Sequence, residues 1–384
     1  MSEFQTFLKD KPYEFVPLLE KCERIKYSRH NVLEKDTYNG KLKLKIIVES
    51  PLHVGGKQHD YDKNGNIIKK QMCRNGTVII PGSSFKGAVR AVAEAVSYSC
   101  AVKLPDQILK RALPLTNNYS CSSIEDRLCI TCSTFGMANE STNNQKNKSN
   151  HYRGKVIFGE FVLETGTLIQ EMLPKLESPF KNYPDSHDVF SKDRKKHIYG
   201  NERLYYCKAC NTGNCQNCNK EEFFQCIEEA GTNREMRFRG RKFYNSDRID
   251  SNKKLENKKE INSSQEVNHR KENVNEERTC YEMIEHGSVL RGEIIFQNLR
   301  KEEVKLLAYA LGIGDTFTMR LGYGKPLGYG KIKVELESVE NINERYGIKK
   351  ELNESIIKDW IQEYRTSSPN DIQKVIYEFE RIMS

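Results

Sequence analysis

Four strand-like stretches, separated by two stretches with helical spacing, constrain the fold of this chain most strongly. Residues 42–48 place apolar side chains at alternate positions, the period-two pattern of a strand with one buried face. After the turn Pro81–Ser84, apolar residues recur at helical spacing, which predicts a helix from about Ser84 to Ser99. Further strands are expected at 156–163, 289–296 and 332–336, and a helix over 304–311. The order β-α-β-β-α-β predicts an α+β protein with a ferredoxin-like (RRM-like) core.

Long insertions and terminal segments account for the remaining length. We divide the chain into an N-terminal extension (1–40), a first part of the core (41–164), an insertion (165–287), a second part of the core (288–340) and C-terminal helices (341–384). The 51–80 region is expected to be a loop. Within the insertion, 246–278 has no aromatic residue and many charges, so we expect it to be disordered.

Composition narrows the classes of function. Lys and Arg total 62 against 53 acidic residues, a net charge of +9, which favours a polyanionic partner without identifying one. No stretch approaches the run of about 20 apolar residues that a membrane-spanning helix needs. The first residues also lack the apolar stretch of a signal peptide. We therefore expect a cytoplasmic protein without a membrane partner.

The 12 cysteines point to metal binding, because several form CxxC pairs and no export signal accompanies them. The densest group has the spacing C-x2-C-x4-C-x2-C and comprises Cys207, Cys210, Cys215 and Cys218. Four thiolates at this spacing suit a tetrahedral, structural zinc ion that braces the insertion. The alternative is a set of reduced free thiols.

A second metal site is suggested by Cys121, Cys129 and Cys132. Its fourth ligand is not evident from the sequence. The candidates are Cys100, Cys73 and His151.

The segment 322–331, GYGKPLGYGK, places four glycines in nine positions immediately before the last expected strand. Glycines allow positive φ and a close approach of the backbone to a ligand, while Tyr323 and Tyr329 offer flat faces for a base. The alternative is a glycine-rich β-bulge. The RNA-binding candidates in this segment are Gly322, Gly324, Lys325, Gly328 and Lys331.

This loop and several other segments, in the same order, resemble the RAMP superfamily of CRISPR-associated proteins, especially the RNA-binding subunits of type III effector complexes. The segments are ESPLHVGG (49–56), IPGSSFKGAVR (80–90), CITCSTFG (129–136) and GKVIFGE (154–160). RGRKFY (239–244) is similar to a motif of one branch. The resemblance implies a subunit that binds CRISPR guide RNA along its phosphate backbone, meets target RNA and stacks against other type III effector subunits.

The IPGSSFKGAVR segment supplies further RNA-binding candidates. Lys86 and Arg90 lie one turn apart on the expected helix, so the two side chains could straddle phosphates, and Ser84 lies at the start of the helix. The alternative is a solvated helix face. In the 55–76 loop, Lys69 and Lys70 are candidates of the same kind.

The resemblance also raises the question of catalysis. In catalytic subunits that resemble this chain, an aspartate in the loop corresponding to 55–76 supports metal-dependent cleavage of target RNA. Asp60 and Asp62 are the carboxylates of this loop, with a divalent metal such as magnesium as the implied cofactor. The alternative for DYDKNGN is an ordinary hairpin turn.

Two other functions remain open at this point. One is a stand-alone RAMP endoribonuclease that processes the precursor guide transcript. The other is a zinc-braced RNA-binding domain unrelated to CRISPR. Whether the protein is an enzyme is therefore left open.

Overall fold

The computed structural model describes residues 12–19, 21–27, 30–63, 65, 67–100, 121, 127–139, 150–174, 176, 205–207, 236–238, 240–245 and 278–384. The predicted disorder of 246–278 falls, apart from its last residue, outside the described residues. The same holds for Cys210, Cys215 and Cys218.

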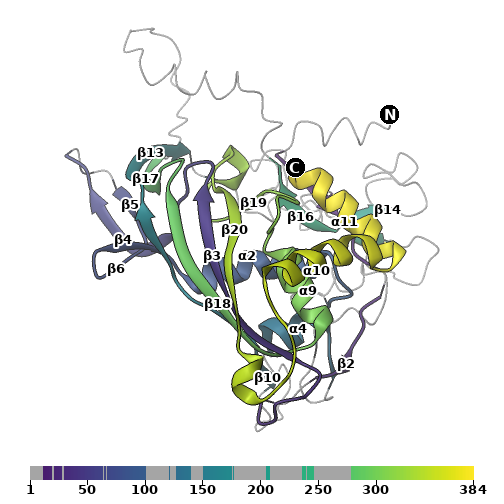
Figure 1. Ribbon diagram of the computed structural model, residues 1–384. Helices are drawn as coiled ribbons and strands as arrows, with labels where there is room; N and C mark the ends of the chain where they lie inside the picture. The colour runs from purple at the N-terminus through teal and green to yellow at the C-terminus, as the bar shows by residue number, and fades with distance from the viewer. Residues whose placement is uncertain are drawn as a thin grey trace.

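The largest element is an eight-stranded sheet with C-terminal helices packed beside it, so the protein is of the mixed α+β class (Figure 1). The strand order along the sheet is β19 (Met319–Arg320), β20 (Lys331–Asn341), β3 (Tyr38–Val48), β18 (Val289–Leu299), β12 (Phe161–Thr165), β7 (Thr77–Ile80) and β6 (Cys73–Arg74), and β11 (Val156–Phe158) also pairs with β18. Each neighbouring pair is antiparallel.

One face of this sheet carries the core. The alternate residues Leu42, Leu44, Ile46 and Val48 are fully buried, which confirms the strand predicted at 42–48. The helices of the core are α2 (Gly82–Ala95), α9 (Lys301–Ala310), α10 (Glu354–Ser367) and α11 (Asn370–Met383). Apolar residues of all of them join one hydrophobic cluster with the sheet, and α9, α10 and α11 lie together on one side of it (Figure 1). In the part of the chain that the structure describes, no helix combines the length and apolarity needed to cross a bilayer.

The opposite face of the sheet carries ion pairs. Lys45 Nζ lies 3.1 Å from Glu335 Oε2, and Lys41 Nζ lies 3.3 Å from Glu293 Oε2. Arg291 pairs with Glu337 at 2.6 Å. These lysines and this arginine are therefore already neutralised by side chains of neighbouring strands.

A second, four-stranded sheet was not foreseen. Its order is β13 (Leu168–Pro174), β17 (Arg278–Ile284), β5 (Ile67–Gln71) and β4 (Gly55–Tyr61). The 51–80 region, expected to be a loop, thus contains the β4–β5 hairpin, while β13 and β17 lie within the expected insertion. The pairing between β17 and β5 joins residues that are far apart in the sequence and is parallel, so no local hairpin signal predicts this contact.

The first helix ends earlier than expected. It begins at Gly82 and ends at Ala95 rather than Ser99. Ser97 Oγ donates a hydrogen bond to the carbonyl of Ala93 at 2.6 Å, and the chain then turns to bring Cys100 into a buried cluster. A local side-chain bond of this kind competes with continuation of the helix.

The second expected strand is divided into β11 and β12. The start of α2 packs closely on this point, since a Cβ added at Gly82 would lie 2.1 Å from the carbonyl oxygen of Phe158. The amide of Gly159 donates to Glu293 O at 2.9 Å. The IPGSSFKGAVR and GKVIFGE segments therefore meet in space.

Smaller elements complete the described chain. They are β1 (Tyr13–Val16) paired with β16 (Arg241–Tyr244), β2 (Ile25–Lys26) with β8 (Arg127–Leu128), β9 (Gly136–Asn139) with β10 (Asn150–Arg153), β14 (Tyr205–Cys207) with β15 (Met236–Phe238), the helix α4 (Ile130–Phe135), and the 3₁₀ turns η4 (Lys325–Leu327) and η5 (Asn343–Tyr346).

Candidate metal centre and nucleic-acid interface

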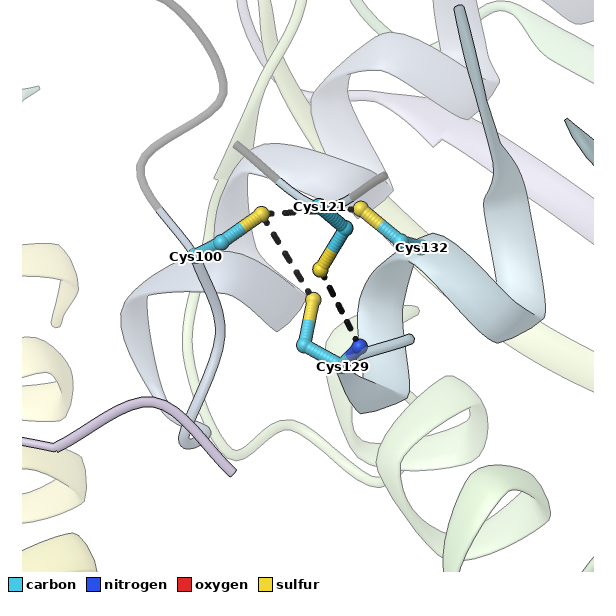
Figure 2. Close-up of side chains that lie close together, drawn as sticks. All are labelled: Cys100, Cys121, Cys129 and Cys132. Carbon is cyan, nitrogen blue, oxygen red and sulfur yellow. Dashed lines mark hydrogen bonds between the residues drawn. The ribbon is translucent and has the colours of Figure 1, made fainter. Parts of the chain in front are cut away.

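Four buried cysteines converge beside α2 and α4. The sulfur atoms of Cys100, Cys121, Cys129 and Cys132 all lie within 4.8 Å of one another and point toward a common centre (Figure 2). The Sγ atoms of Cys100 and Cys132 are 3.6 Å apart, and those of Cys129 and Cys100 are 3.7 Å apart. Tetrahedral zinc with bonds of about 2.3 Å separates its sulfurs by about 3.8 Å, whereas a disulfide needs about 2.05 Å. The spacing suits a structural zinc ion.

Hydrogen bonding within the cluster favours the thiolate, the form that binds metal, at Cys121 and Cys129, whereas it raises the pKa values of Cys100 and Cys132. Hydrogen bonds with Cys100 are the main reason that the pKa of Cys129 is well below its ordinary value. Hydrogen bonding with Cys100 likewise lowers the pKa of Cys121 to about 3. In addition, the amide of Cys129 donates to Cys121 Sγ at 3.2 Å.

A cation lies against the cluster. Arg90 Nη2 approaches Cys132 Sγ at 3.8 Å, while its Nη1 donates to Gly136 O at 2.8 Å. A zinc ion with four thiolates carries a net charge of −2, so an adjacent guanidinium would offset part of that charge. The donor set, its burial and this cation together fit a closed structural zinc site.

The structure brings some of the predicted metal ligands together and places others elsewhere. Cys121, Cys129 and Cys132 lie together as expected, and Cys100 supplies the fourth sulfur. The other two candidates are elsewhere, because Cys73 is on β6 and His151 is exposed on β10. Of the C-x2-C-x4-C-x2-C group, only Cys207, the last residue of β14, belongs to the described chain.

The glycine-rich loop packs against the ESPLHVGG segment. The amide of Tyr323 donates to His53 O at 2.9 Å, and the amide of Gly330 donates to Pro51 O at 3.0 Å. Gly322 has φ of 77°, and a Cβ there would lie 2.2 Å from the carbonyl oxygen of His53. Two segments that carry the resemblance therefore form one structural unit, in which Gly322 permits the close approach.

Several amides of this loop are used internally. Gly328 donates to Lys325 O at 3.1 Å, closing η4 between Gly324 and Gly328, which both adopt positive φ. Lys331 donates its amide to Ser50 Oγ at 2.8 Å. The glycines of this loop thus shape the turn.

Two lysines on the motif segments lack acidic partners in the described part of the chain. Burial lowers the pKa of Lys325, on η4, and no opposing charge raises it. Burial, with Arg90 adding to the effect, also lowers the pKa of Lys86 on α2. The Nζ of Lys86 has one distant acceptor, Val156 O at 3.5 Å. Both side chains are half-buried cations without a compensating carboxylate.

The other basic candidates differ in their surroundings. Lys70 Nζ pairs with Glu282 Oε1 at 2.5 Å. Arg90 Nε donates to Glu94 Oε1 at 2.8 Å, so all three of its nitrogens have partners within the protein. Lys69 is exposed on β5, and Ser84 is half-buried in the first turn of α2.

Asp60 and Asp62 belong to the β4–β5 hairpin. Asp60 is exposed near the end of β4, and its Oδ1 accepts a hydrogen bond from the Tyr61 amide at 2.8 Å. The carbonyl of Asp62 accepts from the Gly65 amide at 3.0 Å, which forms the turn. Among the described residues, the cysteine cluster is the one group of three or more His, Cys, Asp or Glu side chains arranged to hold a metal. A metal ion at Asp60 would therefore take further oxygen ligands from its substrate or from water.

An aromatic stack beside the loop was not predicted as a unit. The rings of Tyr281 on β17 and Tyr323 are nearly parallel, with centroids 4.6 Å apart and planes inclined by 17°. His53 lies edge-on to Tyr281 at 5.0 Å, and its Nδ1 donates to Glu282 O at 2.7 Å. Sequence alone marked Tyr323 through its glycine-rich context, but Tyr281 lies on a strand without a clear pattern.

A comparison with protein families finds a matching family model. The model described as the RAMP superfamily matches residues 45–333, which is more than half of the chain. The matched range includes the cysteine cluster, the β4–β5 hairpin and the glycine-rich loop. No curated protein matches this chain.

Proposed function

Because the chain belongs to the RAMP superfamily of CRISPR-associated proteins, we propose that it is a guide-RNA-binding subunit of a type III CRISPR effector. Membership of the superfamily implies a role in binding CRISPR guide RNA. The assignment to type III rests on the order of the motif segments given above. Its proposed partners are guide RNA, target RNA and other subunits of the effector.

The observation that carries the proposal is that Lys86 and Lys325 are half-buried and have no acidic partner among the described residues. Burial of a charged group costs free energy unless an opposite charge compensates it. On the open face of the large sheet, Lys41 and Lys45 have carboxylate partners in Glu293 and Glu335. Lys86 and Lys325 lie on motif segments and have none among the described residues. Phosphates of an RNA backbone would supply the missing charge.

Arg90 is a weaker candidate for a phosphate contact than the two lysines. Its donors are engaged by Glu94, Gly136 and Cys132, so we rank Lys86 and Lys325 ahead of Arg90 as phosphate contacts. The remaining proposed contacts come from the exposed Lys69 and from Lys70, Lys331, Ser84 and the glycines of the loop.

A ferredoxin-like core is the fold that we propose for the division into 41–164 and 288–340. The antiparallel order β20-β3-β18-β12 supports it, since these are the fourth, first, third and second core strands of the expected β-α-β-β-α-β order. Along the chain, helix α2 comes after the first core strand, β3, and helix α9 comes after the third core strand, β18, as the β-α-β-β-α-β order requires.

Cleavage of target RNA is the proposed activity of the β4–β5 hairpin. Asp60, exposed at the end of β4, is the first candidate for binding a divalent ion such as magnesium together with RNA oxygens, and Asp62 is the second. Such an ion would stabilise charge that develops on the scissile phosphate.

The experiment that tests the function is to purify the protein from its host at low salt and to sequence the RNA that accompanies it. Low salt matters because phosphate contacts weaken steeply as salt rises. Short RNAs with a CRISPR repeat tag, together with other effector subunits, are expected. Repeat transcripts cut by this chain alone would favour the processing endoribonuclease instead, and the absence of enriched RNA would contradict RNA binding.

A further inference from the structure

The stack of Tyr281 and Tyr323 differs from the other aromatic contacts of the described chain. Its planes are inclined by 17°, whereas the next most parallel ring pairs are inclined by 31°. Both tyrosines are half-buried, so part of each residue reaches solvent. Ring pairs in protein cores are commonly edge-to-face or offset, and a parallel stack outside the fully buried core offers a flat surface on which another ring can lie.

The same neighbour holds both rings in place. The carbonyl of His53 accepts a hydrogen bond from the Tyr323 amide at 2.9 Å, and the imidazole of His53 lies edge-on to Tyr281. His53 is itself buried and is fixed by its bond to Glu282 O at 2.7 Å. A platform held in this way loses little conformational entropy when a ligand binds.

Charge is distributed unevenly around the platform. The strand register places Glu171, Tyr281, Lys69 and His59 side by side across the four-stranded sheet. Directly opposite residues share a face of a sheet, so Lys69 lies on one side of Tyr281 and Glu171 on the other. Lys69 is exposed and has no acidic partner in the described ranges. A ligand with a flat ring and a phosphate would therefore direct the phosphate toward Lys69.

We propose that Tyr281 and Tyr323 form a stacking site for one unpaired base of a bound RNA, with Lys69 contacting the adjacent phosphate. The inference rests on the proposed RNA-binding function and adds a defined position at which a base is held out of a duplex. Because every base has a flat π-face, the site should show little preference among bases. Loss of one stacked base is expected to weaken RNA binding by about 5- to 150-fold.

The test uses the full-length protein and a synthetic single-stranded RNA that contains 5-iodouridine. Irradiation followed by mass spectrometry of the peptides should identify a cross-link at Tyr281 or Tyr323. In binding measurements with the same RNA, Tyr323→Leu and Tyr281→Leu should weaken affinity within the range given above, while Tyr323→Phe and Tyr281→Phe should retain it because the ring remains. The matched control is Tyr377→Leu on α11, where the tyrosine is 67% exposed and has no stacked partner among the described residues.

The outcomes separate this inference from the proposed function. If the protein binds RNA but the leucine variants bind as tightly as the unsubstituted protein and no cross-link maps to either tyrosine, the stacking site is wrong while the RNA-binding function stands. If the unsubstituted protein binds no RNA, both are wrong. Where Tyr281→Leu fails to fold, the cross-link on the unsubstituted protein decides.

Discussion

Arg241 donates a hydrogen bond from Nη1 to the Glu94 carboxylate at 2.8 Å, although the two residues are 147 positions apart. Glu94 also accepts from Arg90, which in turn contacts Cys132. A second nitrogen of Arg241 donates to Cys100 O at 3.3 Å. Arg241, which begins β16 and belongs to the RGRKFY segment, thus connects the end of α2 to the cysteine cluster and has a structural role.

Replacing Arg241 should therefore destabilise the fold. Arg241→Met would leave the buried Glu94 with one partner instead of two and remove the bond to Cys100, and we expect a loss of about 1–3 kcal/mol in the free energy of unfolding. Chemical denaturation measures it. Arg345→Met is the control, since Arg345 is in an exposed ion pair. Equal stability of the two variants would contradict the structural role.

The zinc content of cysteine variants should show which cysteines bind zinc. With a cluster at Cys100 and a second site at 207–218, the purified protein should contain about two zinc ions per chain. Cys100→Ser should lose one of them, because the cluster then has three sulfurs. Cys73→Ser, a half-buried cysteine outside the cluster, should retain both. Elemental analysis checks this, and Cys100→Ser with unchanged zinc would refute the assignment of the cluster.

Replacing Asp60 should abolish cleavage of target RNA without affecting assembly of the complex. Its side chain is exposed, so Asp60→Ala should leave the complex and guide binding intact while guide-matched RNA is no longer cut. Asp62→Ala, singly and with Asp60→Ala, shows whether the second carboxylate contributes. Asp36→Ala, at another exposed aspartate, is the control. Unchanged cleavage by the double variant would remove the catalytic assignment.

We expect the half-buried charge of Lys325 to reduce the stability of the protein when no RNA is bound. Burial lowers its pKa, so the charged form costs stability at every pH below that lowered value, and this cost disappears as the pH rises through it toward 10.5. Lys325→Met is expected to raise the free energy of unfolding at pH 7 by about 0.5–1 kcal/mol. Thermal unfolding without RNA checks this.

The matched control for that measurement is Lys70→Met. Lys70 pairs with Glu282, which raises the pKa of Lys70, so its removal should destabilise the protein or leave it unchanged. A lower unfolding midpoint for Lys325→Met than for Lys70→Met would show that Lys325 stabilises the fold and is not a cation held for a ligand.

Local patterns made part of this structure predictable. The alternation at 42–48 identified β3 and helical spacing identified α9, because each pattern reflects one face buried in the same core. The helices expected within 341–384 are α10 and α11. Strands β13 and β17 were missed because their pairing joins distant segments, and the local β4–β5 hairpin was missed because more than half of its residues are polar or glycine.

The candidate site was likewise predictable only in part from local sequence patterns. Spacing grouped Cys121, Cys129 and Cys132, but Cys100 joins them only because α2 ends at Ala95 and the chain then turns. The lysines were identified by their motif segments. Their lack of acidic partners, and the stacking of Tyr281 on Tyr323, depend on tertiary contacts that no local pattern contains.

The measurement that tests the central claim most directly is the salt dependence of guide-RNA binding by the protein and by the double variant Lys86→Met with Lys325→Met. If both lysines contact phosphates, the variant should bind at least about tenfold more weakly, and the slope of log affinity against log salt should fall in magnitude by about 2. Unchanged affinity and an unchanged slope would contradict the account.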